Sequence, residues 1–100
     1  MVLKNFDLNN IRTSYYDSTN VLKSIYDIQT NSLEVIFGKG QHYLYEGIIP
    51  YIYQRFQLSQ SKGKAVQDYL VKHNKNIQKL ENISNEELIE IKEFIINAKK

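Results

Sequence analysis

Three short runs with the residue types and alternation of β-strands follow one another in the chain, at positions 21–27, 32–37 and 42–46. Turn-forming residues separate the runs, at positions 28–31 and in the Gly38-Lys39-Gly40 segment. Consecutive strands that are joined by such short connections pair antiparallel. The sequence therefore predicts a three-stranded antiparallel β-meander.

Helical patterns follow the predicted meander. Pro50 fits the first turn of a helix, because the N–H group that proline lacks would have no intrahelical partner there. We predict a helix over about 51–58, whose Tyr53 and Phe56 lie on the face that covers one side of the meander. After a short break the helical pattern restarts at Lys64, which predicts a second helix.

The end of the chain carries a capping box. The Ser84 hydroxyl can accept a hydrogen bond from the Glu87 N–H group at the start of a helix that we predict over 85–98. The apolar stripe of this helix is too broad to leave in water, so the helix must dock on its own domain or on a second chain. The side chains that we expect in a protein contact are Leu88, Ile91, Phe94 and Ile95.

These patterns together predict an α+β fold. A three-stranded antiparallel meander is packed by two or three helices, and an extra amphipathic helix follows at the C-terminal end. The chain has 100 residues, 42% of them hydrophobic, which is the composition of one folded domain. Residues 1–13 fit neither period and are expected to form an irregular or docked arm. The remaining parts are an α+β domain at 14–76, and a linker with the last helix at 77–100.

Several classes of protein are excluded by what the sequence lacks. Cysteine is absent, so disulfides, zinc–thiolate sites and iron–sulfur clusters have no ligands. No apolar run approaches the ~18 to 20 residues of a membrane-spanning helix, and no signal-peptide segment is recognised. We expect a soluble, cytoplasmic protein without membrane contacts.

Catalytic patterns are missing as well. His42 and His73 are far apart in the sequence and neither belongs to an i, i+4 metal pair. No nucleophile with a neighbouring base, no carboxylate pair and no glycine-rich nucleotide loop can be assigned. We therefore expect that the protein is not an enzyme and needs no cofactor or metal.

Positive charge is concentrated in one segment. The net charge of the chain is +2, but residues 61–80 carry five lysines against Asp68 alone, a local balance of +4. If the second helix continues, Lys72, Lys75 and Lys79 lie on one of its faces. Two interpretations remain: a surface that attracts phosphate, or an ordinary solvated helix face.

The order of motifs resembles the KTSC domain family, small domains named after a C-terminal appendage of some lysyl-tRNA synthetases and also found as stand-alone proteins. The resemblance spans about residues 14–73, and it implies a small α+β domain with a suggested RNA-binding role, not an enzyme. Family members usually place an aromatic pair after the S-K-G motif, where this chain has Ala65 and Val66. The matching motifs are Val21-Leu22-Lys23-Ser24-Ile25-Tyr26-Asp27, Leu33-Glu34-Val35-Ile36-Phe37, Tyr43-Leu44-Tyr45, Gly47-Ile48-Ile49-Pro50 with Tyr53 and Phe56, and Ser61-Lys62-Gly63-Lys64.

Two tyrosines of the third predicted strand are candidate stacking residues. Tyr43 and Tyr45 project from one face of the strand, where their rings can stack on successive bases of a single strand. The competing interpretation places both rings in the core beneath the helices, with their hydroxyls at its rim. Core packing is the commoner use of such a pair.

The Ser61-Lys62-Gly63-Lys64 segment is a candidate phosphate site. Free N–H groups at a helix start attract an anion, and the two lysines add positive charge. The alternative is an inter-helix turn in which Ser61 caps the next helix and Gly63 relieves backbone strain. Arg55, Lys72, Lys75 and Lys79 are candidates to extend the phosphate-binding surface.

Two functions follow from these observations. The first is a non-catalytic module that binds RNA or single-stranded nucleic acid weakly, through the S-K-G-K helix start and the lysine face. The second is a protein-interaction or assembly subunit, for example a small phage virion component, that uses the last helix to contact a partner or another copy. In the second case we expect the protein in a virion rather than in the cytoplasm.

Overall fold

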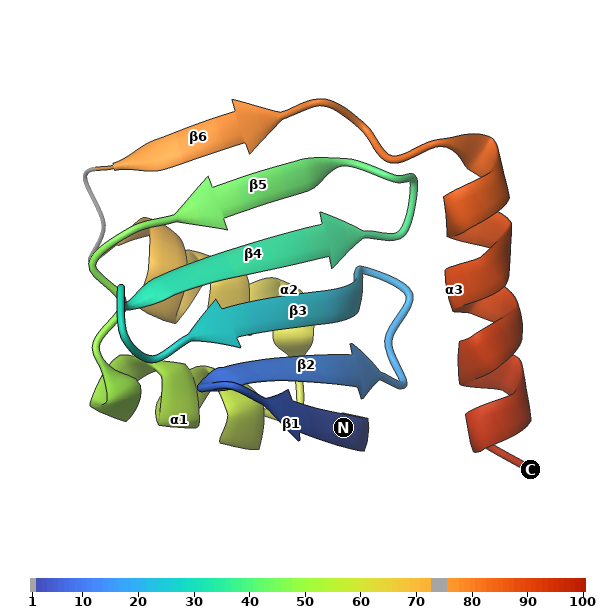
Figure 1. The fold of residues 1–100 in the computed structure, drawn as a ribbon, viewed down its shortest axis with the longest axis horizontal. Helices are drawn as coiled ribbons and strands as arrows, with labels where there is room; N and C mark the ends of the chain where they lie inside the picture. Colours follow the sequence, from blue (N-terminus) through green and yellow to red (C-terminus); the bar gives the residue numbers. More distant parts are fainter. Residues whose placement is uncertain (1, 73–75) are drawn as a thin grey trace.

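The computed structural model describes residues 2–72 and 76–100. In these residues six β-strands form one sheet, and each strand pairs antiparallel with the next strand along the chain (Figure 1). Because the sheet order follows the chain order, β1 and β6 are the edge strands. The strands are β1 (Val2–Leu8), β2 (Ile11–Tyr16), β3 (Val21–Asp27), β4 (Ser32–Phe37), β5 (His42–Tyr45) and β6 (Ile77–Leu80).

The sheet has six strands, so the predicted number of three is wrong, although the three predicted strands are confirmed as β3, β4 and β5. β1 and β2 form where we expected an irregular arm, and β6 forms in the predicted linker. Asn9 and Asn10 join β1 to β2 with positive φ angles of 52° and 68°, a conformation that asparagine tolerates in tight hairpin turns. Apolar alternation does not reveal this hairpin, because its signal lies in the turn. The boundaries at 13 and 77 stay a prediction.

Three helical segments cover one face of the sheet, and a further helix lies beside the strand ends (Figure 1). The predicted helices at 51–58 and 85–98 are confirmed, and Pro50 begins the first of them. Ser84 Oγ accepts a hydrogen bond from Glu87 N at 3.1 Å, as the capping box predicts. The elements are α1 (Pro50–Leu58), α2 (Lys62–Ala65), the π-helical segment η1 (Val66–Val71) and α3 (Asn85–Ala98).

The second predicted helix is shorter than the lysine pattern requires. It ends with η1 at Val71, and Lys79 lies in β6, so Lys79 does not share a helix face with Lys72. The predicted lysine face is therefore wrong for Lys79. Asparagine at positions 74 and 76 has a low helix propensity, which favours the end of the helix here. His73 and Lys75 lie outside the described residues.

The main core fills the space between the sheet and the α1, α2 and η1 layer. Tyr26 of β3 stacks on Tyr53 of α1, with ring centroids 4.0 Å apart and an interplanar angle of 6°. Burial of these aromatic and aliphatic side chains provides most of the driving force for the packing of the two layers. The buried members are Tyr16, Val21, Tyr26, Leu33, Val35, Tyr45, Ile48, Tyr53, Phe56, Ala65, Val66 and Leu70.

A polar cluster joins the sheet to α1 inside this core. The hydroxyls of Tyr16 and Ser24 lie 2.6 Å apart, which connects β2 to β3. Gln57 of α1 donates from Nε2 to the hydroxyls of Tyr16 and Tyr53, each at 2.7 Å. Burial raises the pKa of Tyr16 above its ordinary value of 10. Because buried hydroxyls need partners, these bonds fix α1 in one orientation on the sheet.

The C-terminal helix α3 packs on the other side of the sheet. Val35 and Ile36 are neighbours on β4 and point to opposite faces, and Ile36 belongs to a second core with Ile91 and Ile95 of α3. At the end of α3, Lys99 Nζ forms an ion pair with Asp17 Oδ1 at 2.9 Å. One of the two expected outcomes for this helix is thus observed: α3 docks on its own domain.

The tight turn after β4 generates a prediction for stability. A Cβ atom on Gly38 would lie 2.3 Å from the backbone oxygen of Thr19, which is closer than packed atoms allow. We therefore expect Gly38→Ala to lower the free energy of unfolding by about 1–3 kcal/mol, measured by urea denaturation. Lys39→Ala in the same turn is the matched control and should change stability by less than about 0.5 kcal/mol. Equal stability of the two variants would contradict the close packing of this turn.

Candidate functional site

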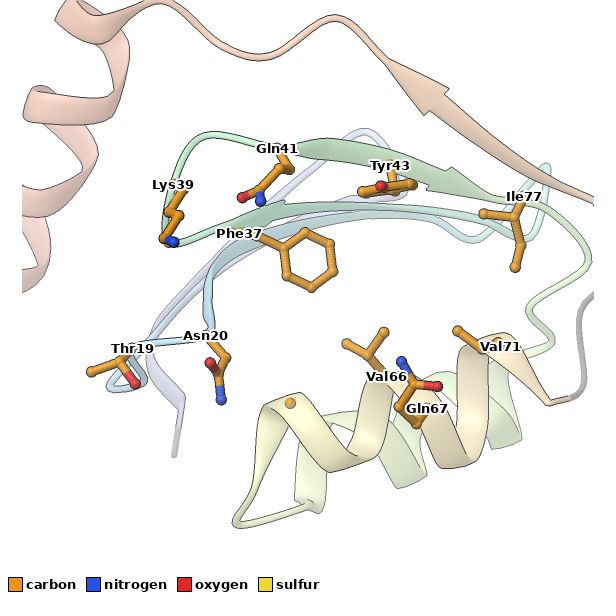
Figure 2. Close-up of a pocket in the computed structure, with 12 residues that line it drawn as sticks. Thr19, Asn20, Phe37, Lys39, Gln41, Tyr43, Val66, Gln67, Val71 and Ile77 are labelled. Atoms are coloured by element: carbon orange, nitrogen blue, oxygen red, sulfur yellow. The ribbon is translucent and has the colours of Figure 1, made fainter.

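An open groove lies between the sheet and the α2 and η1 segments, with a volume of about 780 Å³ (Figure 2). Aromatic and polar side chains from the sheet side face aliphatic and amide side chains from the helical side. A site of this size holds a small molecule, or part of a larger ligand. The lining residues are Thr19, Asn20, Phe37, Gly38, Lys39, Gln41, Tyr43, Gly63, Val66, Gln67, Val71 and Ile77.

Backbone hydrogen bonds fix two loops at one end of the groove. Gly38 N donates to Asn20 O at 2.9 Å, which holds the loop between β2 and β3 against the turn after β4. Phe37 N donates to Gln41 O at 2.8 Å and Gly40 N donates to Phe37 O at 2.9 Å, which close the turn itself. The side chains that these loops present therefore have a defined position at the groove.

The glycine of the S-K-G motif lies at the groove, next to Asn20. A Cβ atom on Gly63 would lie 2.7 Å from Asn20 Nδ2, so the absence of a side chain lets the amide approach α2. Ser61 Oγ accepts from Lys64 N at 3.4 Å, which confirms the expectation that Ser61 caps the following helix. The motif thus acts as a cap and also borders the groove.

Phe37 and Tyr43 form the aromatic wall. Their ring centroids are 5.6 Å apart at an interplanar angle of 90°, and both side chains are half-buried. Tyr45, two residues further along β5, is only 3% exposed and belongs to the main core. Core packing is therefore confirmed for Tyr45, whereas Tyr43 packs against the core and lines the groove as well. Burial raises the pKa of Tyr45 to about 12.

Neutral polar groups and lysine give the groove its electrostatic character. Among the twelve lining residues, Lys39 is the charged one, and the amides of Asn20, Gln41 and Gln67 supply donors and acceptors. Lys79 of β6 pairs with Tyr43 in the register of the sheet, so a second lysine lies beside the aromatic wall. The lining residues include no carboxylate, which leaves the groove suited to a neutral or anionic ligand.

Lys62 does not point to solvent as a phosphate ligand must. Its side chain is 1% exposed, and Nζ donates to Gln57 O at 3.0 Å and to Ser59 O, the carbonyls that end α1. The ammonium also lies 5.3 Å from the centroid of the Tyr16 ring. A cation at a helix C-terminus stabilises the helix through its unpaired carbonyls and its dipole. Desolvation lowers the pKa of this ammonium from its ordinary value of 10.5.

The other predicted phosphate contacts do not gather at one place. The guanidinium of Arg55 lies over the rings of Tyr51 and Tyr69, with each centroid 5.9 Å away. Lys72 Nζ lies 3.6 Å from Asp68 Oδ1, an exposed ion pair of small energy. Lys64 is exposed on α2, beside Gly63. Lys75 lies outside the described residues.

The residues predicted for protein contacts are used largely inside the molecule. Ile91 and Ile95 are buried against the sheet, and Leu88 packs beside them. The ring of Phe94 lies 4.4 Å from that of Tyr15 and 6.0 Å from that of Phe6, centroid to centroid. The inner face of α3 is therefore occupied by its own sheet.

Sequence reasoning does not identify most of the groove. Phe37 shares a strand face with Leu33 and Val35, and this pattern indicates a core residue. Asn20 and Gln41 carry no sequence signal that distinguishes them from ordinary loop residues. The useful signals are the S-K-G motif and the Tyr43-Leu44-Tyr45 motif, since Gly63 and Tyr43 border the groove.

In the part of the chain that the structure describes, no group of three or more histidine, aspartate or glutamate side chains could hold a metal ion. None of the described helices has the length and apolar character required to cross a bilayer.

Comparison with known proteins identifies the domain. A family model described as KTSC domain matches residues 17–73. This chain belongs to the KTSC domain family. The crystal structure of a KTSC domain protein from Yersinia pestis is similar in fold, with a TM-score of 0.64 and 22% sequence identity over 71% of this chain and 99% of that chain. No curated protein matches the chain.

The KTSC domain contains almost the whole groove. Every lining residue except Ile77 lies within the matched residues 17–73. The strands β1, β2 and β6 and the helix α3 lie outside this match. The groove therefore lies almost entirely in the part of the chain that matches the family model, and β1, β2, β6 and α3 lie outside that part.

The buried position of Lys62 predicts that this lysine acts on stability and not on ligand binding. Lys62→Met removes the donor for two carbonyls at the end of α1, so we expect the free energy of unfolding to fall by about 1–3 kcal/mol. Urea denaturation measures the change, and Lys64→Met on the exposed side of α2 is the matched control. A Lys62→Met protein of unchanged stability would contradict the capping role.

The raised pKa of Tyr45 predicts a loss of stability at alkaline pH. An unfolded tyrosine ionises near pH 10 and the folded Tyr45 near pH 12, so the free energy of unfolding falls as the pH rises through this window. The absorbance of tyrosinate measures the ionisation, and urea denaturation at pH 9 and 11 measures the stability. Tyr45→Phe should reduce this pH dependence. The exposed Tyr51→Phe is the matched control for the loss of one tyrosine hydroxyl.

Proposed function

We propose that this KTSC domain is a non-catalytic module that binds RNA or another single-stranded nucleic acid, weakly, in the groove. The observation that carries the proposal is the combination of an aromatic wall, side-chain amides and lysine in one open groove without a carboxylate. The aromatic wall matches the plane of a base, the amides match its edge, and the lysine matches the phosphate.

The aromatic wall supports stacking of a base. Phe37 and Tyr43 are half-buried, so their rings are held by the core and keep an accessible part at the groove (Figure 2). A base that stacks on a fixed ring loses little side-chain entropy, and such contacts contribute about 1–3 kcal/mol each. The accessibility of these rings supports stacking on Phe37 and Tyr43 rather than on the buried Tyr45.

The amides opposite the rings support contacts with base edges. Asn20 and Gln41 come from the two fixed loops, and Gln67 comes from the π-helical segment η1. Carboxamide groups both donate and accept hydrogen bonds, as do the edges of the bases. An irregular helical segment such as η1 is also frequent at functional sites.

Lysines around the groove support phosphate contacts. Lys39 lines the groove, Lys64 follows Gly63 at its border, and Lys79 pairs with Tyr43 across β5 and β6. A few exposed lysines give weak binding whose affinity falls steeply with salt concentration. The proposed phosphate surface thus retains Lys64 and Lys79 of the sequence-based set and replaces Lys62 by Lys39.

The experiment is fluorescence anisotropy of a labelled single-stranded RNA at two salt concentrations. We expect Phe37→Leu or Tyr43→Leu to weaken binding by about 5- to 100-fold, because the stacking contact is lost while an apolar side chain remains. The control is Tyr51→Leu, since Tyr51 is an exposed tyrosine on α1 outside the groove. Each variant is first shown by urea denaturation to be folded.

A second set of variants tests the phosphate contacts. Lys39→Ala with Lys64→Ala should lower the slope of log affinity against log salt by about 1.4, or about 0.7 for each lost contact with a single strand. The control is Lys4→Ala with Lys92→Ala, which removes two exposed lysines on β1 and α3. Absence of RNA binding by the folded wild-type protein would contradict the proposal. An equal decrease of the salt slope in the Lys39 and Lys64 variant and in its Lys4 and Lys92 control would contradict it as well.

The assembly function remains the second candidate, and one observation favours it. Ile89 and Ile96 are 55% and 56% exposed and lie seven residues apart, on one outer side of α3. A contact through this helix would therefore use its outer side, because Ile91 and Ile95 are buried against the sheet. Ile89→Lys should weaken such a contact, and sedimentation velocity measures the change.

A further inference from the structure

The edge strand β1 combines free backbone groups with exposed apolar side chains. It lies at the end of the sheet order, next to β2 alone, so one side of its backbone has no strand partner in the described structure. Phe6 is 50% exposed and Leu8 is 73% exposed. An unpaired edge with apolar residues is a template for pairing with another extended chain.

The register of the hairpin indicates which backbone groups of β1 face outward. Leu8 and Ile11 close the two-residue turn, and alternate residues of an antiparallel strand direct their backbone groups to opposite sides. Leu8 and Phe6 therefore face β2, whereas Asp7 and Asn5 face outward. The irregularity of the β1–β2 register lies between Val2 and Lys4, so the outward-facing residues belong to the regular part of the strand.

A second groove, with polar and apolar lining residues, lies behind this edge, between β1 and α1. Its volume is about 480 Å³, and the lining residues include no carboxylate. Gln54 and Gln57 of α1 face Asn5 of β1 across it, and Arg12 of β2 lines it as well. A carboxylate placed beside β1 would therefore find the exposed amide of Gln54 as a partner, because Gln57 Nε2 already donates to the hydroxyls of Tyr16 and Tyr53. The remaining lining residues are Val2, Pro50, Tyr53 and Leu58.

We propose that two copies of this chain associate edge to edge through β1, antiparallel, with Phe6 opposite Phe6. In this register each Asn5 lies opposite an Asp7, so the outward-facing backbone groups of one copy meet those of the other. The arrangement has two-fold symmetry and closes, because the same strand serves both copies. The two sheets become one continuous sheet of twelve strands, six from each copy.

Apolar complementarity on the α3 side of the sheet supports this register. Phe6 lies 6.1 Å from Tyr15 and 6.0 Å from Phe94, centroid to centroid, and half of its surface remains open. In the proposed pair the ring of the second copy covers this open part. Aromatic pairs at directly opposed positions, where side chains approach most closely, stabilise antiparallel strands.

Polar complementarity on the α1 side supports the same register. Asp7 Oδ1 accepts from Arg12 Nε at 2.7 Å and Asp7 Oδ2 accepts from Arg12 Nη2 at 3.1 Å, so the carboxylate enters the contact with its charge balanced. Opposite it lies Asn5 of the second copy, whose groove contains the exposed amide of Gln54. The symmetry places the second copy's Asp7 over the first groove in the same way.

The other edge of the sheet fits a second copy less well. β6 has four residues, and Gln78 and Lys79 on it are exposed and polar. Each edge carries one exposed lysine, Lys79 on β6 and Lys4 on β1, so length and apolar character distinguish the two edges. The longer and more apolar β1 is therefore the edge that we assign to self-association.

Sedimentation velocity of the full chain, without nucleic acid, tests the proposal over protein concentrations from about 10 μM to 1 mM, the range of weak association. We expect a monomer–dimer equilibrium, and we expect Phe6→Lys to weaken the dimer by about tenfold or more, because two like charges then oppose each other. The control Ile89→Lys changes an equally exposed apolar residue on α3 and should leave the dimer unchanged. A wild-type protein that stays monomeric overturns the proposal, as does a dimer lost in Ile89→Lys and kept in Phe6→Lys.

Amide hydrogen exchange by NMR of the wild-type protein provides a test that needs no variant. The amides of Asn5 and Asp7 should become protected as the protein concentration rises, because they pair only in the dimer. The amides of Phe6 and Leu8 pair with β2 and should be protected at every concentration. A dimer in which the Asn5 and Asp7 amides exchange as fast as in the monomer overturns the β1 assignment. Neither measurement depends on nucleic-acid binding, so the two proposals fail separately.

Discussion

The contact of the Lys62 ammonium with the end of α1 determines how the helical layer is arranged. Lys62 Nζ donates to the carbonyls of Gln57 and Ser59, and thereby holds the first residue of α2 against the last turn of α1. The next residue, Gly63, is placed beside Asn20 at the border of the groove. Gln57 also donates to the hydroxyls of Tyr16 and Tyr53. The last turn of α1 is therefore hydrogen-bonded both to the sheet, through Tyr16, and to α2, through Lys62. The chain contains no cysteine, and packing with this polar cluster is what joins the layers.

The elements that sequence reasoning finds are those whose signals are local. β3, β4 and β5 have turn residues between them, α1 begins at a proline, and α3 begins at a capping box. β6 is short and exposed, and β1 lacks the alternation of a half-buried strand, because its register is set by the Asn9-Asn10 turn and by pairing with β2. Such strands are stabilised by their neighbours rather than by their own sequence, so periodicity misses them. The sheet consequently has twice the predicted number of strands.

The site is harder to predict than the fold because it combines residues from separate loops. Phe37 ends a strand whose earlier residues, Leu33 and Val35, are fully buried. The sequence pattern does not show that the helices cover Leu33 and Val35 but leave part of Phe37 open to the groove. A lysine in a basic motif is usually solvated, so the burial of Lys62 under Tyr16 and Phe56 follows only from the packing of α1 and α2. The S-K-G motif therefore lies beside the groove because of how Lys62 and Gly63 pack, and not because its lysines attract phosphate.

The groove and the β1 edge lie at opposite ends of the sheet, which makes the two proposals compatible. The groove is bordered by the β4–β5 turn, β5 and β6, and β1 is the far edge strand. In a twelve-stranded dimer nine strand spacings separate the two β5 strands, roughly 40 Å at the usual distance between strands. Under the two proposals, a short single strand would occupy one groove and would gain nothing from the dimer. A strand long enough to reach both grooves would bind the second one at a raised effective concentration, so weak individual contacts would give a stronger interaction without any new site.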